Sequence, residues 1–357
     1  MIIGVPREIK SHEYRVALTP EGTNQLVQDG HQVLIEPEAG AGSGFDDAAY
    51  QRAGAAIALR EQLFGQAELL LKVKEPLQSE YDLLRQGQIL FTYLHLAPNR
   101  ELTGLLVQRG VTAFGYETLE LNGTTPLLTP MSEIAGRMAP LVGAWYLQRP
   151  HGGTGVLPGG VAGVRPARAV IVGAGVVGSN AVRVALGIGM DTVVLNRGSD
   201  RLRQIDQEFH GAVRTLIMNP TCLAQELVDA DLVVGALYRT GARTPVVIDR
   251  AMLGHMKHGA VLVDVSIDQG GCCIASRPTT HEAPVFTEQG VIHYCVANMP
   301  GAYPHTATLA LTSATLPYIR TLAKWGVEQA LQHSPELTSA LNIHQGAIRH
   351  PTLCAAT

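Results

Sequence analysis

Three glycines near the middle of the chain constrain its fold more than any other feature. Gly173, Gly175 and Gly178 follow the apolar run AVIV and open VVGSNAVRVALG, a segment of helical composition. A GxGxxG turn between a strand and a helix is typical of dinucleotide-binding domains, in which the backbone approaches a pyrophosphate at the helix N-terminus. A glycine-rich turn without a ligand is the alternative, and the strand-to-helix context argues against it.

The surrounding segments repeat a strand-and-helix rhythm. Six short apolar runs begin at this turn and continue to residue 298, namely ARAVIVGAG, DTVVLNRG, GAVRTLIMN, ADLVVGALY, AVLVDVSID and GVIHYCVAN. The N-terminal third has its own apolar runs, ELLLKVKEP, QILFTYLHLA and VTAFGYETLE, between helical stretches. Such alternation predicts parallel sheets. With 357 residues, the chain is long enough for two domains of α/β class.

The composition excludes several other classes of protein. Hydrophobic residues make up 46% and charged residues 16%, with a net charge of −4, so we expect compact cores and no nucleic-acid or anionic-membrane surface. The N-terminus is charged early and lacks the apolar core of a signal peptide. Glycines, Asn180 and Arg183 interrupt the longest apolar region, which argues against a membrane span. Five cysteines without CxxC spacing predict reduced thiols in a cytoplasmic protein and no metal site.

The residue that ends the second run bears on the choice of cofactor. In an NAD-binding domain this strand usually ends in Asp or Glu, which accepts hydrogen bonds from the adenosine ribose. This chain has Asn196 followed by Arg197. Asn196 carries no charge to repel a 2′-phosphate, and Arg197 would attract one. Alternatively, Arg197 points into solvent and Asn196 replaces Asp with weaker NAD affinity. Both interpretations remain open, so we expect NAD with NADP use possible.

Four further side chains are candidates for binding a small acid and for moving protons. Arg15, Lys74 and His95 lie in EYRVALTP, LKVKEP and YLHLA, the last two at the ends of expected strands. Cationic groups suit a small carboxylate, and His is a proton carrier near neutral pH. Asp268 ends the strand VDVSID before a glycine turn. The alternatives are solvated cations, a structural His and an Asp that caps a turn.

Taken in order, these segments closely resemble the alanine dehydrogenase family, which also includes transhydrogenase α-subunits. The matching segments are GVPREIKSHEYRVALTP, KVKEP, FTYLHLA, PLLTPMSEIAGR, GAGVVG, DVSIDQGG and VANMPGA. The resemblance implies a Rossmann-type nucleotide domain, residues 129–304, inserted into a discontinuous α/β substrate domain, residues 1–128 and 305–357. It also implies a homohexamer that interconverts L-alanine with pyruvate and ammonium by reversible NAD-dependent oxidative deamination.

The resemblance also assigns roles to individual residues. Arg15 and Lys74 would hold the carboxylate and carbonyl of the substrate, His95 would be the general acid and base, and Asp268 would be the second catalytic group. The cofactor would be bound by a larger set of residues, namely Ser132, Gly173, Gly175, Gly178, Asn196, Arg201, Leu237, Tyr238, Val265, Ile267, Arg277, Val296, Asn298 and Met299.

Departures from the family pattern gather near the expected adenosine half of the cofactor. Asn196 replaces the usual Asp, Met218 stands where Ser is common, and Tyr238, Arg239 and Thr240 replace a different stretch. These changes leave room for a non-catalytic or weakened NAD(P)(H)-binding homologue as the alternative function.

A second alternative is the nucleotide-binding subunit of a proton-translocating transhydrogenase. That subunit would need a membrane partner, and it would not need Lys74 and His95 in these roles. Another change, Tyr303-Pro304-His305, follows the Asn-Met-Pro-Gly turn without a physical explanation.

Overall fold

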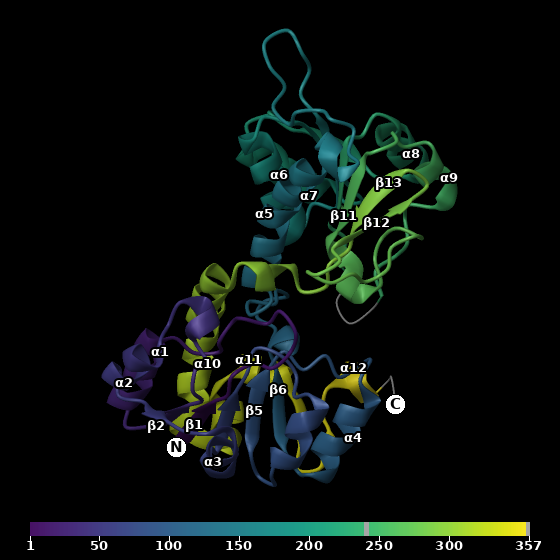
Figure 1. The fold of residues 1–357 in the computed structure, drawn as a ribbon. Helices are drawn as coiled ribbons and strands as arrows, with labels where there is room; N and C mark the ends of the chain where they lie inside the picture. The colour runs from purple at the N-terminus through teal and green to yellow at the C-terminus, as the bar shows by residue number, and fades with distance from the viewer. Residues whose placement is uncertain (239–242, 355–357) are drawn as a thin grey trace. The chain divides into compact units, whose positions relative to one another are not determined.

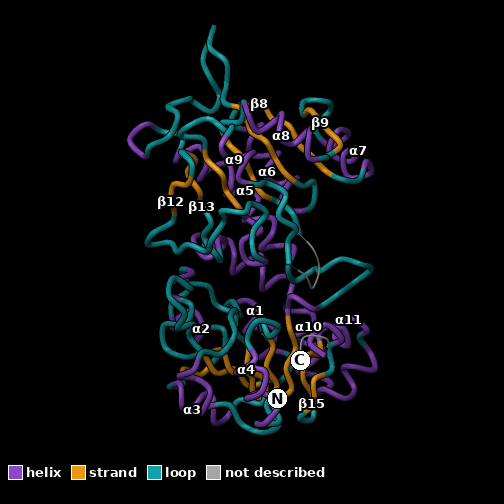
Figure 2. The backbone as a smooth tube through the Cα atoms, turned by 90° about the vertical axis from the view of Figure 1, so that its right-hand side faces the viewer, coloured by secondary structure: helices purple, strands orange, loops and turns teal. Residues whose placement is uncertain are grey.

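The computed structural model describes residues 1–238 and 243–354, which form two compact units. Unit 1 comprises Met1–Met131 and Gly301–Thr357, and unit 2 comprises Ser132–Pro300. Each unit has one sheet, drawn in orange in Figure 2, and both sheets are mostly parallel. The expected α/β fold, with one domain inserted into a discontinuous other, is confirmed.

Unit 1 is built on an eight-stranded sheet in the order β15-β14-β6-β5-β4-β1-β2-β3. The strands from β6 to β3 run parallel, whereas β14 pairs antiparallel with both β6 and β15. Their bounds are β1 Ile2–Val5, β2 Gln32–Ile35, β3 Ala56–Ile57, β4 Leu69–Leu71, β5 Ile89–Thr92, β6 Thr112–Gly115, β14 Leu341–His344 and β15 Ala347–Ile348. The apolar runs of the N-terminal third form the central strands because both of their faces are covered.

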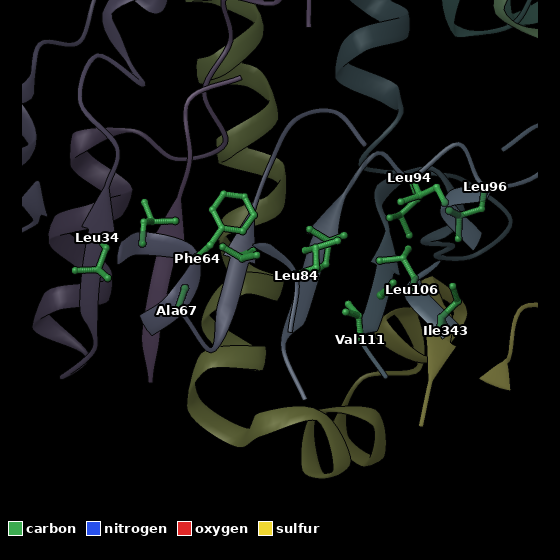
Figure 3. Packing of buried hydrophobic residues seen from close by; sticks show 14 of the residues in the cluster. Leu34, Phe64, Ala67, Leu84, Leu94, Leu96, Leu106, Val111 and Ile343 are labelled. Atoms are coloured by element: carbon green, nitrogen blue, oxygen red, sulfur yellow. The ribbon is translucent and has the colours of Figure 1, made fainter. Parts of the chain in front are cut away.

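Helices cover both faces of this sheet (Figures 1 and 2). They are α1 Pro20–Gln28, α2 Asp47–Arg52, α3 Arg60–Gln66, α4 Arg100–Gln108, α10 Pro304–His333, α11 Pro335–Ala340 and α12 Pro351–Cys354. Thr19 caps α1 by accepting a hydrogen bond from Gly22 N. Helices α3 and α4 bury Phe64 and Leu106 against the strands in one apolar cluster (Figure 3).

The C-terminal segment combines a broken helix with two strands. Helix α10 is interrupted at Gly326, which has a φ of +67°. The chain then returns as β14 and β15, two strands that the sequence does not predict. They are short and lie at the edge of the sheet, so they lack the long apolar run that marks a central strand.

Unit 2 carries a seven-stranded sheet in the order β12-β13-β11-β10-β7-β8-β9. Its strands are β7 Arg168–Val172, β8 Asp191–Asn196, β9 Arg214–Ile217, β10 Leu232–Gly235, β11 Val261–Asp264, β12 Val285–Glu288 and β13 Val291–Tyr294. Read from β7, the parallel strands have the 3-2-1-4-5-6 order of a Rossmann fold. All six expected strands are present, and the antiparallel edge strand β12 is an addition.

The helices of unit 2 are α5 Thr129–Tyr146, which begins in unit 1, then α6 Val176–Gly187, α7 Ser199–Glu208, α8 Pro220–Val228 and α9 Arg250–Gly254. Helices α8 and α9 pack against one face of the sheet through Leu227 and Leu253. Helix α5 approaches both α6 and the sheet closely, because a Cβ at Gly136 would meet Val177 O and one at Gly143 would meet Leu232. Within residues 1–238 and 243–354, no helix combines the length and apolar character that crossing a membrane requires.

Candidate active site

In unit 1 the candidate residues follow the carboxyl ends of parallel strands, where such sheets present ligands. Lys74 comes shortly after β4, His95 comes shortly after β5, and Arg15 lies between β1 and α1. Arg15 and Lys74 are buried and His95 is half-buried. The three therefore lie on the edge of the sheet that is formed by the carboxyl ends of its parallel strands, called here the carboxyl edge.

Arg15 is held by an internal carboxylate. Its Nε and Nη2 donate to the two oxygens of Glu13 at 2.6 and 2.5 Å, and its Nη1 lies 3.0 Å from the sulfur of Met131. Burial alone would lower the pKa of Arg15, but the charge of Glu13 raises it above its ordinary value. The guanidinium is thus a fixed, buried cation whose bidentate face is already used by Glu13.

Lys74 stands beside a buried ionic cluster formed by Glu8, Lys72 and Glu80. Glu8 Oε1 accepts hydrogen bonds from Val73 N at 2.6 Å and Lys74 N at 3.2 Å, while its Oε2 lies 3.1 Å from Lys72 Nζ. Lys72 also donates to Glu80 at 3.0 Å. Burial alone would lower the pKa of Lys72, but the two carboxylates raise it. The backbone at Lys74 is therefore fixed by a side chain from the segment after β1.

The ring of His95 is stacked on Tyr93, with centroids 6.2 Å apart and planes 19° from parallel. Tyr93 donates its hydroxyl hydrogen bond to Leu127 O at 2.6 Å. Burial raises the pKa of Tyr93, and the positive charge of Arg15 acts against this rise. Tyr93 thus connects the surroundings of Arg15 with those of His95.

Glu75 adds a carboxylate to the same edge. Its Oε1 accepts from Lys10 Nζ at 2.6 Å, and its buried Oε2 has no hydrogen-bond partner among the described residues. Burial raises the pKa of Glu75, but the hydrogen bond and charge of Lys10, together with the charge of His95, lower it below its ordinary value.

A cavity of about 370 Å³ opens beside this edge of unit 1. It is lined by residues 7–10 and 12–15 with Glu38, Ala39 and Gly42, so it includes Arg15 and its partner Glu13. Among the described residues, no group of three or more His, Cys, Asp or Glu side chains could hold a metal ion. Of the three candidate residues Arg15, Lys74 and His95, only Arg15 lines this cavity.

In unit 2 the three fingerprint glycines form the turn between β7 and α6. Gly173 has a φ of +115°, and a Cβ there would meet Ala236 O at 2.5 Å. A Cβ at Gly178 would lie 1.9 Å from Gly173 O, so only glycine allows this close packing of helix and strand. Around Gly175, the N-cap of α6, a Cβ would meet nothing within 4 Å. The helix N-terminus is thus open where a phosphate would approach.

Asn196 lies at the end of β8, next to this turn. Its Oδ1 accepts a hydrogen bond from Ala174 N at 3.2 Å, and its Nδ2 donates to Gly198 O at 2.9 Å. Arg197 is exposed. The amide therefore ties the end of β8 to the glycine turn, a role that the sequence did not predict.

The Asp268 turn follows β11 and is organised by a different carboxylate, Asp264. Asp264 Oδ1 accepts from Ser266 N at 3.1 Å, and Oδ2 accepts from Cys272 N at 2.8 Å and Ser276 Oγ at 2.6 Å. Burial raises the pKa of Asp264, although these hydrogen bonds act to lower it. Asp268 itself is exposed. The interpretation of Asp268 as a turn cap therefore fits Asp264 instead.

Most of the remaining candidate cofactor residues lie on the turns that follow the strands of unit 2. Val265 and Ile267 belong to the Asp268 turn, Leu237 and Tyr238 follow β10, Val296, Asn298 and Met299 follow β13, Arg201 is in α7 and Ser132 is in α5. Arg277 instead lies with its guanidinium 4.1 Å from the ring centre of Phe286 on β12. Arg239 and Thr240 lie outside the described residues.

Models of one protein family match nearly the whole chain. The N-terminal domain of alanine dehydrogenase/PNT matches residues 4–135, and its C-terminal domain matches residues 139–351. The chain belongs to the alanine dehydrogenase/PNT family. It is 48% identical to the alanine dehydrogenase of Bacillus subtilis (strain 168) over 351 residues, which cover 98% of this chain and 93% of that relative.

Solved structures agree with this membership of the alanine dehydrogenase/PNT family. An L-alanine dehydrogenase superposes with a TM-score of 0.97 at 45% identity, covering 100% of this chain and 99% of the other. A transhydrogenase from Sinorhizobium meliloti superposes with a TM-score of 0.84 at 24% identity, covering 98% and 99%. The second similarity shows a shared fold alone.

The sequence did not single out four acidic residues that hold the candidate residues in place. Glu8, Glu13, Glu117 and Asp264 accept hydrogen bonds from the candidate residues or from the backbone that carries them. A usable signal was present, because each lies within ten residues of a strongly apolar strand, where an acidic side chain becomes buried only when it is paired.

Proposed function

We propose that this chain is an L-alanine dehydrogenase, which interconverts L-alanine with pyruvate and ammonium by reversible NAD-dependent oxidative deamination. One observation carries the proposal most directly. A buried Arg, a buried Lys and a half-buried His share one sheet edge in a chain that is 48% identical to alanine dehydrogenases along nearly its whole length. Residues 1–128 and 305–357, which lie within unit 1, form the proposed substrate domain, and residues 129–304 form the proposed nucleotide domain.

The glycine turn of unit 2 fits a dinucleotide. The open surroundings of Gly175, its position as the N-cap of α6 and the Rossmann strand order favour binding of a pyrophosphate there. When bound, the nicotinamide cofactor supplies hydride transfer to and from the substrate Cα. We assign cofactor contacts to the turns after the strands of unit 2, namely to Ser132, Asn196, Arg201, Leu237, Tyr238, Val265, Ile267, Arg277, Val296, Asn298 and Met299 in addition to the three glycines.

Arg15 and Lys74 are the proposed substrate-binding residues. Arg15 is fixed by Glu13, so it can bind a carboxylate without first having to be ordered. We assign the substrate carbonyl to Lys74, whose charge stabilises negative charge that develops on that oxygen. Two cations held on one sheet convert an encounter in solution into an oriented complex.

His95 and Asp268 are the proposed catalytic residues. His is suited to give and take protons near neutral pH while water adds to the imino acid and ammonia leaves. The His95 ring lies nearly parallel to that of Tyr93, whose hydroxyl group is anchored on Leu127 O. Asp268 is exposed at its turn, as expected of a carboxylate that acts on a ligand.

For the cofactor we propose NAD, with NADP accepted as well. Asn196 presents no negative charge beside the glycine turn, and Arg197 next to it is exposed and cationic. A carboxylate at position 196 would repel a 2′-phosphate, and this chain lacks one.

We also propose a cytoplasmic homohexamer. All five cysteines are free thiols, which suits a reducing compartment. A hairpin that projects from unit 2 between α5 and β7 exposes Leu157, Val161 and Val164 by about 60% each, and burial of such side chains between copies is favourable (Figure 1). Light scattering coupled to size-exclusion chromatography should give six times the mass of one chain.

The initial rates of NADH and NADPH oxidation with pyruvate and ammonium test the proposed function. Turnover with both cofactors is expected, and Asn196→Asp should shift the ratio of kcat/KM values toward NADH. Turnover with NADH alone would leave the enzyme assignment intact but remove NADP. No turnover with either cofactor, combined with measurable NADH binding, would identify a binding protein instead.

A further inference from the structure

The backbone of His95 adopts a conformation that few non-glycine residues adopt. Its φ is +48°, in the left-handed region. L-residues enter this region at a cost, and they stay there only when the surrounding structure fixes them. The residue that we propose as general acid and base therefore depends on contacts that keep its backbone in place.

Glu117 supplies such contacts. Its Oε1 accepts hydrogen bonds from His95 N at 2.7 Å and from Leu94 N at 3.1 Å, and its Oε2 lies 3.2 Å from Leu94 N. Hydrogen bonds to a charged carboxylate are stronger than those to a neutral acceptor. One side chain thus binds two successive amides at the point where the chain turns into the left-handed conformation.

The sheet explains why Glu117 reaches this turn. Strands β5 and β6 are parallel neighbours, with Thr92 paired to Gly115 at their carboxyl ends. Three residues beyond Thr92 the chain reaches His95, and two beyond Gly115 it reaches Glu117. The carboxylate therefore bridges two adjacent strand ends, and its position is set by the sheet.

The neighbours of His95 in the sequence are fixed independently. Leu94 is fully buried in the apolar cluster of unit 1, as Figure 3 shows. Tyr93 is anchored through its hydroxyl group. Loss of the Glu117 contacts would therefore leave the core in place and release mainly the Leu94–His95 peptide and the imidazole that follows it.

We propose that Glu117 is a positioning residue for His95, and that its carboxylate keeps the imidazole where proton transfer requires it. This inference rests on the proposed function. Glu117 acts through the backbone of His95 rather than on the substrate, so its removal should lower kcat and leave cofactor binding unchanged.

Steady-state kinetics of Glu117→Ala and Glu117→Gln, with pyruvate, ammonium and NADH, test the proposal. For Glu117→Ala we expect kcat to fall about 10- to 100-fold, the effect of displacing a catalytic group by about 1 Å. The dissociation constant of NADH should stay at the wild-type value. Glu117→Gln keeps one oxygen that can accept both N–H groups, so its kcat should lie between those of Glu117→Ala and the wild type.

Asp46→Ala is the matched control. Asp46 Oδ1 likewise accepts a backbone hydrogen bond in unit 1, from Ala49 N at 2.7 Å, but at the start of α2 and away from the candidate residues. Its kcat should equal that of the wild type. An unchanged kcat in Glu117→Ala, or an equal loss in Asp46→Ala, would overturn the positioning role.

A crystal structure of Glu117→Ala tests the same inference without relying on activity. The proposal predicts that His95 leaves its positive φ and that its ring moves off Tyr93. A His95 that keeps both features in the variant would overturn the proposal, whatever reaction the wild type catalyses. Conversely, a wild type inactive on pyruvate, with a displaced His95 in the variant, would refute the proposed function alone.

Discussion

The His95 turn of unit 1 and the Asp268 turn of unit 2 are fixed in similar ways, but their positive φ angles fall on different kinds of residue. Both follow a buried parallel strand, and both are fixed by an acidic side chain that binds backbone amides. At the Asp268 turn the positive φ angles fall on Gly270 and Gly271, at +98° and +79°. At the His95 turn the positive φ falls on the candidate catalytic residue itself.

The origin of the fixing carboxylate also differs. Asp264 binds amides 2, 8 and 9 residues away in its own turn, whereas Glu117 follows the neighbouring strand β6, 22 residues from His95. The Asp268 turn is therefore a local structure, while the His95 turn depends on the assembled sheet. The difference predicts that loss of the Asp264 carboxylate acts mainly on stability, and loss of the Glu117 carboxylate mainly on catalysis.

The largest stability effect is expected for Asp264→Ala. The substitution would leave three backbone N–H groups and the Ser276 hydroxyl without their acceptor in a buried site, at a cost of about 4 kcal/mol. Glu117→Ala should cost only about 1–2 kcal/mol, because it removes an acceptor from two half-buried amides. Urea unfolding, with hydrogen exchange to assign the change to one unit, measures both. Equal losses of unfolding free energy in the two variants would contradict the predicted difference between the two turns.

Acid should weaken unit 2 through His293 on β13. This ring is buried, has no hydrogen-bond partner for either nitrogen among the described residues, and stacks on Phe286 at 4.9 Å. Burial is the main cause that lowers the pKa of His293 to about 4; the charge of Glu288 opposes this shift and that of Arg277 supports it. Since the unfolded chain has a pKa near 6.5, stability present above about pH 6.5 is lost as the pH falls to 4, by up to about 3 kcal/mol.

His293→Leu should remove this part of the acid sensitivity. The variant and the wild type would then differ in the slope of unfolding free energy against pH between 6.5 and 4, with the flatter line for the variant. Parallel lines would show that His293 is protonated in the folded protein.

Removing a glycine from the Asp268 turn should lower stability, whereas introducing one at the His95 turn should relieve strain. A Cβ at Gly271 would lie 2.7 Å from Ser276 Cβ and 2.8 Å from Asp264 Oδ2 at a positive φ, so Gly271→Ala should cost about 2 kcal/mol. At position 95 glycine relieves the left-handed strain, so His95→Gly should be more stable than His95→Ala by about 1 kcal/mol. Thermal melts of the two position-95 variants measure this difference, and an advantage for Ala would contradict the strain.

The sequence predicts the central elements and much of the candidate site, because both produce patterns in residue type. Strands buried on both faces appear as continuous apolar runs, and His95 and Asp268 stand out because they follow such runs. The short strands β12, β14 and β15 were not predicted, since segments such as LNIH or VFTE have no such run. Glu8, Glu117 and Asp264 were missed because they bind backbone amides, which leave no mark on the identity of their partners.

The kinetics of His95→Ala test the central claim most directly, namely that the strained residue after β5 carries the protons of the reaction. With pyruvate, ammonium and NADH, we expect turnover to fall by about 10²- to 10⁴-fold, the contribution of a positioned general acid and base. NADH binding, measured by fluorescence titration of the same variant, should match that of the wild type. Turnover near the wild-type value would remove His95 from the mechanism and contradict the proposed site in unit 1.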